Sequence, residues 1–115
     1  MHTGQDFTSH NPITSKKLND AKVYAGVHGT VTRVARHNGF GDNTVIIDTL
    51  DHRILYGHME KALVTVLQVV TPTTAIGIMG NQGGTFPVHL HVQAVESGGD
   101  IFKGPFVAPT QAGIR

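Results

Sequence analysis

Two histidines, His89 and His91, lie two residues apart in the apolar run of residues 87–93. In an extended strand, residues i and i+2 point to the same face, so both imidazoles would project side by side from one rigid element. Histidine is the commonest metal ligand in proteins and the usual acid or base near neutral pH. A strand with this spacing can offer two imidazoles, as metal ligands or as a metal ligand and a catalytic base, to the same small volume.

A metal site in this chain must use nitrogen and oxygen donors, because the sequence contains no cysteine. Zinc in a hydrolytic site commonly takes three protein ligands and keeps a fourth position for water. Asp6 follows His2 by four residues at the start of the chain, and the threonine and glycine between them favour a loop or strand end over a helix. This pair is a candidate for the site, with a frayed terminus as the alternative interpretation.

His58 ends a predicted strand directly after Tyr56 and Gly57, and a glycine there would let backbone or ligand come close. It is a further candidate for the site, with a hydrogen-bonded structural histidine as the alternative. The remaining histidines lie in a polar loop or in predicted turns, where a solvated surface role is expected: His10, His28, His37 and His52.

The elements that must position these residues are predicted to be strands. Residues 29–36 include a stretch that alternates apolar with polar side chains, which is typical of a half-buried strand. Two further strands are predicted at residues 43–49 and 53–59, with turn sequences at 37–42 and 50–52. Closely spaced strands joined by tight turns predict an antiparallel meander.

The rest of the chain fits the same class. Residues 22–25 and 75–80 are predicted as short strands, and the β-branched content of residues 60–70 favours an extended segment over a short helix. Residues 97–115 are rich in glycine and proline, which predicts a covering loop and tail. Without a long helix or an internal repeat, the chain is expected to be all-β or nearly so.

The composition limits the classes of partner. A chain of 115 residues is expected to form a single domain over 1–115, and its net charge of +1 gives no strong steering towards nucleic acid. No segment approaches the roughly 18 consecutive apolar residues of a membrane span. No signal peptide is recognisable, so we expect either a fragment of a longer protein, such as a lysin, or export by another route.

The motifs, taken together and in order, resemble one family. HTGQDF, VYAGVHGTV, GFGDNTVIID, ILYGHM, AIGIMG and HLHV resemble the lysostaphin-type zinc metallopeptidases, which cut peptide bonds in bacterial peptidoglycan. The resemblance runs from His2 to about Val95. It implies a compact antiparallel β-sheet domain with a substrate groove walled by loops. It also implies that His2, Asp6 and His91 bind Zn²⁺, while His58 and His89 are the catalytic histidines.

The expected function is hydrolysis of cross-bridge or stem peptides of peptidoglycan by a zinc-dependent endopeptidase that uses a metal-activated water. The protein would then work outside the cell, in the cell wall or periplasm, or on a virion as part of a phage assembly. Two alternatives are a weak or inactive module that binds the cell wall or a partner, and a structural zinc domain of a phage tail. The presence of all the implied site residues argues against the former, and the lack of a fourth ligand argues against the latter.

The chain departs from the family pattern at two places near the expected ligands. Only Met1 precedes His2, and Val92-Gln93 stands where the family usually has Phe-Glu. The second departure replaces a carboxylate that would be positioned to contact a metal ligand and tune it. Because an amide can still form hydrogen bonds, an altered activity is expected, not a lost one.

Overall fold

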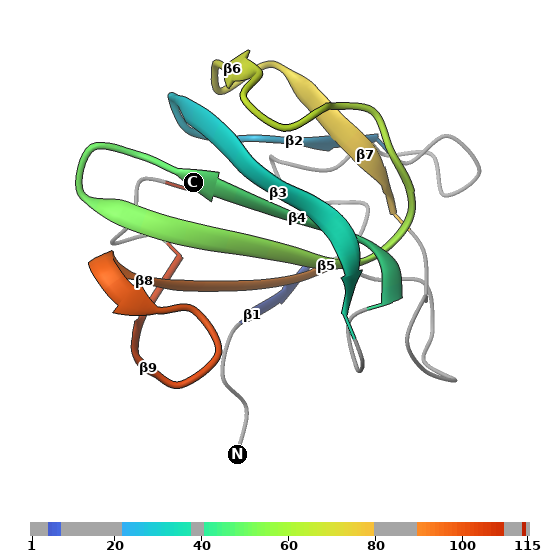
Figure 1. The fold of residues 1–115 in the computed structure, drawn as a ribbon. Helices are drawn as coiled ribbons and strands as arrows, with labels where there is room; N and C mark the ends of the chain where they lie inside the picture. The colour runs from blue at the N-terminus through green and yellow to red at the C-terminus, as the bar shows by residue number, and fades with distance from the viewer. Residues whose placement is uncertain (1–4, 8–21, 38–40, 80–89, 110–113, 115) are drawn as a thin grey trace.

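The protein is all-β in the part of the chain that the structure describes. The computed structural model describes residues 5–7, 22–37, 41–79, 90–109 and 114. Over these ranges the chain forms nine antiparallel strands and no helix, so the predicted fold class is confirmed (Figure 1). Accordingly, no helix of the described residues has the length and apolar character needed to cross a membrane.

The strands belong to one curled sheet. Their bounds are β1 (Gln5–Phe7), β2 (Lys22–Tyr24), β3 (Gly29–His37), β4 (Gly41–Asp48), β5 (His52–Ala62), β6 (Val69–Val70), β7 (Ala75–Met79), β8 (Leu90–Asp100) and β9 (Gly104–Val107). The main path across the sheet is β1-β8-β5-β4-β3-β6. β7 pairs with both β2 and the end of β5, and β9 pairs with β8. Strands from the two ends of the chain therefore meet at β1 and β8 (Figure 1).

The predicted meander is formed by β3, β4 and β5. In this stretch Ile47 of β4 lies opposite Val31 of β3 on one side and Ile54 of β5 on the other. These side chains are fully buried and belong to the main core, together with Val45 and Tyr56. Burying an aliphatic side chain of this size contributes about 1.5–3 kcal/mol, so the alternating pattern accounts for both the strands and the face that they bury.

The opposite face of the sheet carries a smaller apolar cluster, which we call the second cluster: Ile46, Leu55, Val95 and Ile101, with Phe106 packed against it. Part of it comes from the segment that the sequence predicted to be a loop. That prediction is wrong between residues 97 and 107, where β8 continues to Asp100 and β9 folds back on it. Gly98 and Gly104 have positive φ angles of 84° and 85°, and such glycines serve a hairpin as readily as a loop.

The extended conformation favoured for residues 60–70 is confirmed at the two ends of that segment, where residues 60–62 continue β5 and residues 69–70 form β6. It is wrong in between, where residues 66 and 67 form a turn and Leu67 has a positive φ. β5 runs on to Ala62 and there pairs with β7, with Ala62 opposite Gly77. A Cβ atom built on Gly77 would lie 2.4 Å from the Met59 sulfur and 2.7 Å from the Lys61 carbonyl oxygen, so this close strand approach requires glycine. β5 is thus held by β4 and β8 at its start and by β7 at its end.

Candidate active site

Three neighbouring strands bring distant parts of the sequence into one row across the sheet. Asp6 of β1 lies opposite His91 of β8, and His91 lies opposite Gly57 of β5. The next residue of β5 is His58. The order β1-β8-β5 can be followed in Figure 1. Sheet pairing therefore gathers backbone positions 6, 91 and 57–58, which are as many as 85 residues apart in the sequence.

A β-bulge changes the direction of the chain at His58. On β5, Gly57 and His58 lie between the paired residues Tyr56 and Met59, whereas β4 has only Thr44 between their partners. His58 also has a positive φ of 64°, which is uncommon for a residue with a side chain. Bulges of this kind occur next to active sites, where they re-aim a side chain.

The bulge decides which face of β5 carries the imidazole. In an unbroken strand, His58 would follow Ile54 and Tyr56 onto the main-core face. The extra residue instead gives that place to Met59, which is fully buried in the main core with Tyr56. The His58 ring lies edge-on to the His91 ring, with centroids 5.9 Å apart and planes at 78°. Both imidazoles are almost completely buried, with exposed fractions of 5% and 6%.

Tyr56 anchors the strand just before the bulge. Its side chain is fully buried, and its hydroxyl donates a hydrogen bond to the Ala25 carbonyl. Burial raises the pKa of the Tyr56 hydroxyl well above its usual value, so the phenol keeps its proton and remains a donor. Tyr56 and Met59 are thus fixed in the core on either side of the two bulged residues, which restricts where His58 can lie.

His91 is held from its own strand by Gln93. The Nε2 atom of His91 and the Oε1 atom of Gln93 are 2.9 Å apart, and the Nε2 atom of Gln93 donates to the Ile101 carbonyl at 2.7 Å. Gln93 is 1% exposed. Metal-binding histidines almost always use the second ring nitrogen for a hydrogen bond of this type, so the contact fits a ligand role for His91. The amide keeps the contact that the absent family carboxylate was expected to make.

Comparison with known proteins identifies the family. The family model Peptidase family M23 matches residues 1–102 of the 115-residue chain. The chain belongs to peptidase family M23. The resemblance to lysostaphin-type peptidases drawn from the motifs is therefore confirmed. A search among curated proteins finds no match.

Several solved structures have a similar fold. LytU is 26% identical with a TM-score of 0.74, over 96% of this chain and 71% of LytU. The catalytic domain of the antimicrobial peptidase lysostaphin from Staphylococcus simulans is 24% identical with a TM-score of 0.73, over 97% of this chain and 78% of that one. A zinc-containing peptidase from Vibrio cholerae is 29% identical with a TM-score of 0.66, over 83% of this chain and 27% of that one.

The structure places some of the five predicted site residues of this M23 chain. His58 and His91 are brought into ring contact. Asp6 is described as a backbone position beside His91. His2 and His89 lie outside the described residues, and within the described part of the chain no three His, Asp or Glu side chains form a group able to hold a metal. The division into three ligands and two catalytic histidines therefore stays a prediction.

The sequence did not reveal that Ile101 belongs to the surroundings of the site. Its contribution is a backbone carbonyl, which has no side-chain signature. The only sequence signal for this part of the site was the two-residue spacing of His91 and Gln93, which places both side chains on one face of β8. His28 is exposed, as its predicted surface role requires.

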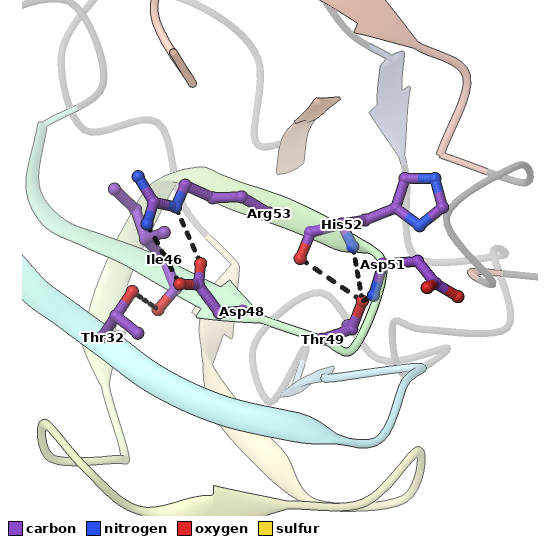
Figure 2. Close-up of polar contacts among 7 residues, drawn as sticks. All are labelled: Thr32, Ile46, Asp48, Thr49, Asp51, His52 and Arg53. Carbon is purple, nitrogen blue, oxygen red and sulfur yellow. Dashed lines mark hydrogen bonds and ion pairs between the residues drawn. The ribbon is translucent and has the colours of Figure 1, made fainter. Parts of the chain in front are cut away.

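A second polar group lies at the start of β5, as Figure 2 shows. There Arg53 forms two hydrogen bonds with the Asp48 carboxylate, from Nε at 2.8 Å and from a terminal guanidinium nitrogen at 3.1 Å. The Thr49 hydroxyl accepts a hydrogen bond from the His52 backbone amide at 3.0 Å and closes the β4–β5 turn, while the His52 imidazole points away from the ion pair. This group serves the hairpin and lies outside the candidate active site.

Proposed function

We propose that the chain is a zinc-dependent endopeptidase domain that hydrolyses peptide bonds in bacterial peptidoglycan. The observation that carries the proposal is the bulge that turns His58 out of the core and into contact with His91. A buried pair of histidines, one of them in an uncommon backbone conformation, is costly to a fold, and such features cluster at active sites. Membership of peptidase family M23 supports the choice of reaction.

The proposed zinc ligands are His2, Asp6 and His91. They form a donor set of two imidazoles and one carboxylate, which suits Zn²⁺ in a catalytic site without cysteine. In support, the sheet register brings residue 6 next to His91, and the ring of His91 is oriented by Gln93. Zinc held there would supply Lewis-acid activation of water and of the scissile carbonyl.

The proposed catalytic residues are His58 and His89. One imidazole takes a proton from the attacking water, and one donates a hydrogen bond to the developing oxyanion or returns the proton to the leaving amine. The buried position of His58 supports such a role, since donors that are fixed and shielded from water stabilise charge more strongly than mobile ones. The route has no covalent enzyme intermediate.

The proposed site of action is the bacterial cell wall, reached from outside the cell, from the periplasm or from a virion. One relative of similar fold is the antimicrobial peptidase lysostaphin, and another is the prophage-encoded M23 protein EnpA from Enterococcus faecalis, at 21% identity and a TM-score of 0.73. These relatives support an extracellular or phage-borne role. We further propose that residues 1–115 act as one metallopeptidase domain.

The test is cleavage of purified muropeptides that carry several types of cross-bridge, with mass spectrometry of the new termini. We expect cleavage that a chelator abolishes and that added Zn²⁺ restores. His91→Ala should lose both bound zinc and cleavage, whereas the control His28→Ala, at an exposed histidine, should keep both. Wall binding without cleavage would replace this proposal with a binding module, and tightly bound zinc without cleavage would replace it with a structural zinc domain.

A further inference from the structure

The side-chain amide of Gln93 is held between two groups of different kinds. On one side is the Ile101 carbonyl, 2.7 Å from Nε2, and on the other is the His91 ring, 2.9 Å from Oε1. A carbonyl oxygen only accepts hydrogen bonds, so the amide must present its NH₂ group to Ile101. The Gln93 oxygen therefore faces His91, and the orientation of the amide follows from the backbone of Ile101.

This orientation determines the proton position on His91. Because Oε1 of Gln93 is an acceptor, Nε2 of the imidazole must be the donor and carries the hydrogen. In a neutral imidazole, the lone pair is then on Nδ1. We propose that Gln93 is a positioning residue that holds His91 in its Nε2–H tautomer, so that Nδ1 is the atom it offers to a metal.

Position 93 is matched to an amide and not to a carboxylate. A glutamate there would still offer an acceptor to His91 Nε2. When ionised, it would also place a second oxygen against the Ile101 carbonyl, and neither of these two acceptors carries a hydrogen. Since Gln93 is 1% exposed, water cannot readily relieve that contact. The amide at position 93 therefore suits the position of the Ile101 carbonyl, which needs a hydrogen-bond donor opposite it.

The position of the Ile101 carbonyl is fixed by packing. Ile101 is 3% exposed and belongs to the second cluster with Ile46, Leu55 and Val95. Gln93 itself lies opposite Leu55 across the β5–β8 pair. The turn between β8 and β9 is thus attached to the sheet by apolar contacts and to His91 by the Gln93 amide. The β8–β9 hairpin therefore helps to orient His91, the candidate metal ligand.

Two substitutions separate the two hydrogen bonds. Gln93→Met has a similar length and makes neither bond. Gln93→Glu keeps an acceptor for His91 and loses the donor to Ile101. The matched control is Gln68→Glu, because Gln68 is half-buried and uses its oxygen to accept from the Thr65 amide at 3.2 Å, a role that a carboxylate can also fill. The control makes the same chemical change at a position that uses only the acceptor.

The first measurement is the tautomer of the neutral His91 ring in metal-free protein, from nitrogen NMR shifts recorded in the pH range where those shifts no longer change with pH. The parent protein and Gln68→Glu should show the Nε2–H form, Gln93→Glu should keep the hydrogen on Nε2, and Gln93→Met should show a mixture of the two tautomers. A parent protein with the hydrogen on Nδ1 would overturn the proposal whether or not the variants fold. So would a folded Gln93→Met with an unchanged tautomer.

The second measurement is zinc affinity by competition with a chromogenic chelator. Gln93→Met should bind zinc about 10- to 100-fold more weakly, the usual effect of losing a hydrogen bond that orients a ligand. Gln93→Glu should lower the midpoint of thermal unfolding more than Gln68→Glu does. Equal zinc affinities of Gln93→Met and the parent would overturn the proposal.

The ligand role of His91 in this inference rests on the proposed function, but the tautomer does not. If the parent protein shows the Nε2–H form and cleaves no muropeptide, the endopeptidase proposal fails and the role of Gln93 stands. If it cleaves muropeptides with the opposite tautomer, the role of Gln93 fails and the endopeptidase proposal stands.

Discussion

The two ends of the β4–β5 pair place polar side chains by opposite means. At the start of β5, the ladder is regular, and Arg53 reaches Asp48 because the two residues are direct partners. Further along, the ladder is broken by an extra residue, and His58 reaches His91 on the next strand because the bulge re-aims it. The first contact follows from regular pairing, whereas the second exists only where regular pairing fails.

The two contacts also differ in how exposed they are and in how they affect stability. The side chains of Arg53 and Asp48 are 38% and 32% exposed, and ion pairs of that kind contribute about 0–1 kcal/mol. His58 and His91 are buried, and the left-handed backbone at His58 costs on the order of 1–2 kcal/mol. Burial of Tyr56 and Met59 beside the bulge offsets that cost. A fold that keeps such a feature points to a functional role for it.

The largest expected effect is on turnover, from substitutions of His58. Both His58→Ala and His58→Gly should reduce muropeptide cleavage by about 10²–10⁴-fold, the usual contribution of a positioned acid or base. Both should retain zinc. Because φ at this position is 64°, the glycine variant should be more stable than the alanine variant by about 1 kcal/mol. Cleavage assays and urea unfolding measure the two effects.

Leu67 provides the matched control for the backbone effect. It also has a positive φ, 74°, and its side chain is 76% exposed. Leu67→Gly should therefore exceed Leu67→Ala in stability by a similar amount, about 1 kcal/mol, with cleavage unchanged in both. If glycine helps at residue 67 but not at residue 58, the backbone of the bulge is not strained, and the two ends of β5 do not differ in strain.

An intermediate effect is expected from Tyr56→Phe. The substitution leaves the Ala25 carbonyl without its hydroxyl donor, which should lower the free energy of unfolding by about 1–3 kcal/mol at neutral pH. The phenol's contribution should also depend on pH. Burial raises the Tyr56 pKa in the folded protein, so above about pH 10 the unfolded chain releases a proton that the folded chain keeps.

The stability contributed by Tyr56 should therefore be complete below about pH 10 and decline as the pH rises further, by up to about 1.4 kcal/mol per pH unit. Urea unfolding at several alkaline pH values would show the difference between parent and Tyr56→Phe shrinking. A difference that stays constant up to about pH 11 would contradict a fully buried phenol at the start of the bulge.

The regularly paired strands could be predicted from the sequence, whereas the bulge in β5 could not. Apolar alternation and β-branched residues gave β3, β4 and the first half of β5, because regular pairing repeats every two residues. Continued past Tyr56, the same alternation would bury His58 in the main core. The only local signal of a change was Gly57, and a glycine in a strand is compatible with several outcomes.

The candidate site shows the same limit. The resemblance in motifs selected His58 and His91, and the structure brings their rings together. The sequence does not indicate the Ile101 carbonyl or the β8–β9 hairpin that carries it, because the glycines of residues 97–107 are as typical of a loop as of a hairpin. Long-range backbone contacts of this kind depend on which strands meet, and that information is not local to any motif.

The smallest expected effect comes from the regular end of β5. Asp48→Asn and Arg53→Met should each change the free energy of unfolding by about 1 kcal/mol or less, with Lys61→Met as the control for losing an exposed positive charge. The hydrogen bond to Asp48 raises the pKa of Arg53, so the guanidinium stays charged and the pair should weaken with added salt. A double-mutant cycle in low and high salt measures the coupling free energy between Asp48 and Arg53.

A coupling above about 2 kcal/mol, or one that salt leaves unchanged, would mean that the ion pair stabilises the sheet as a buried contact would. The two ends of β5 would then differ in geometry but not in how strongly their contacts stabilise the fold. The Arg53–Asp48 pair, placed by regular register, would contribute as much as a buried contact placed by a bulge.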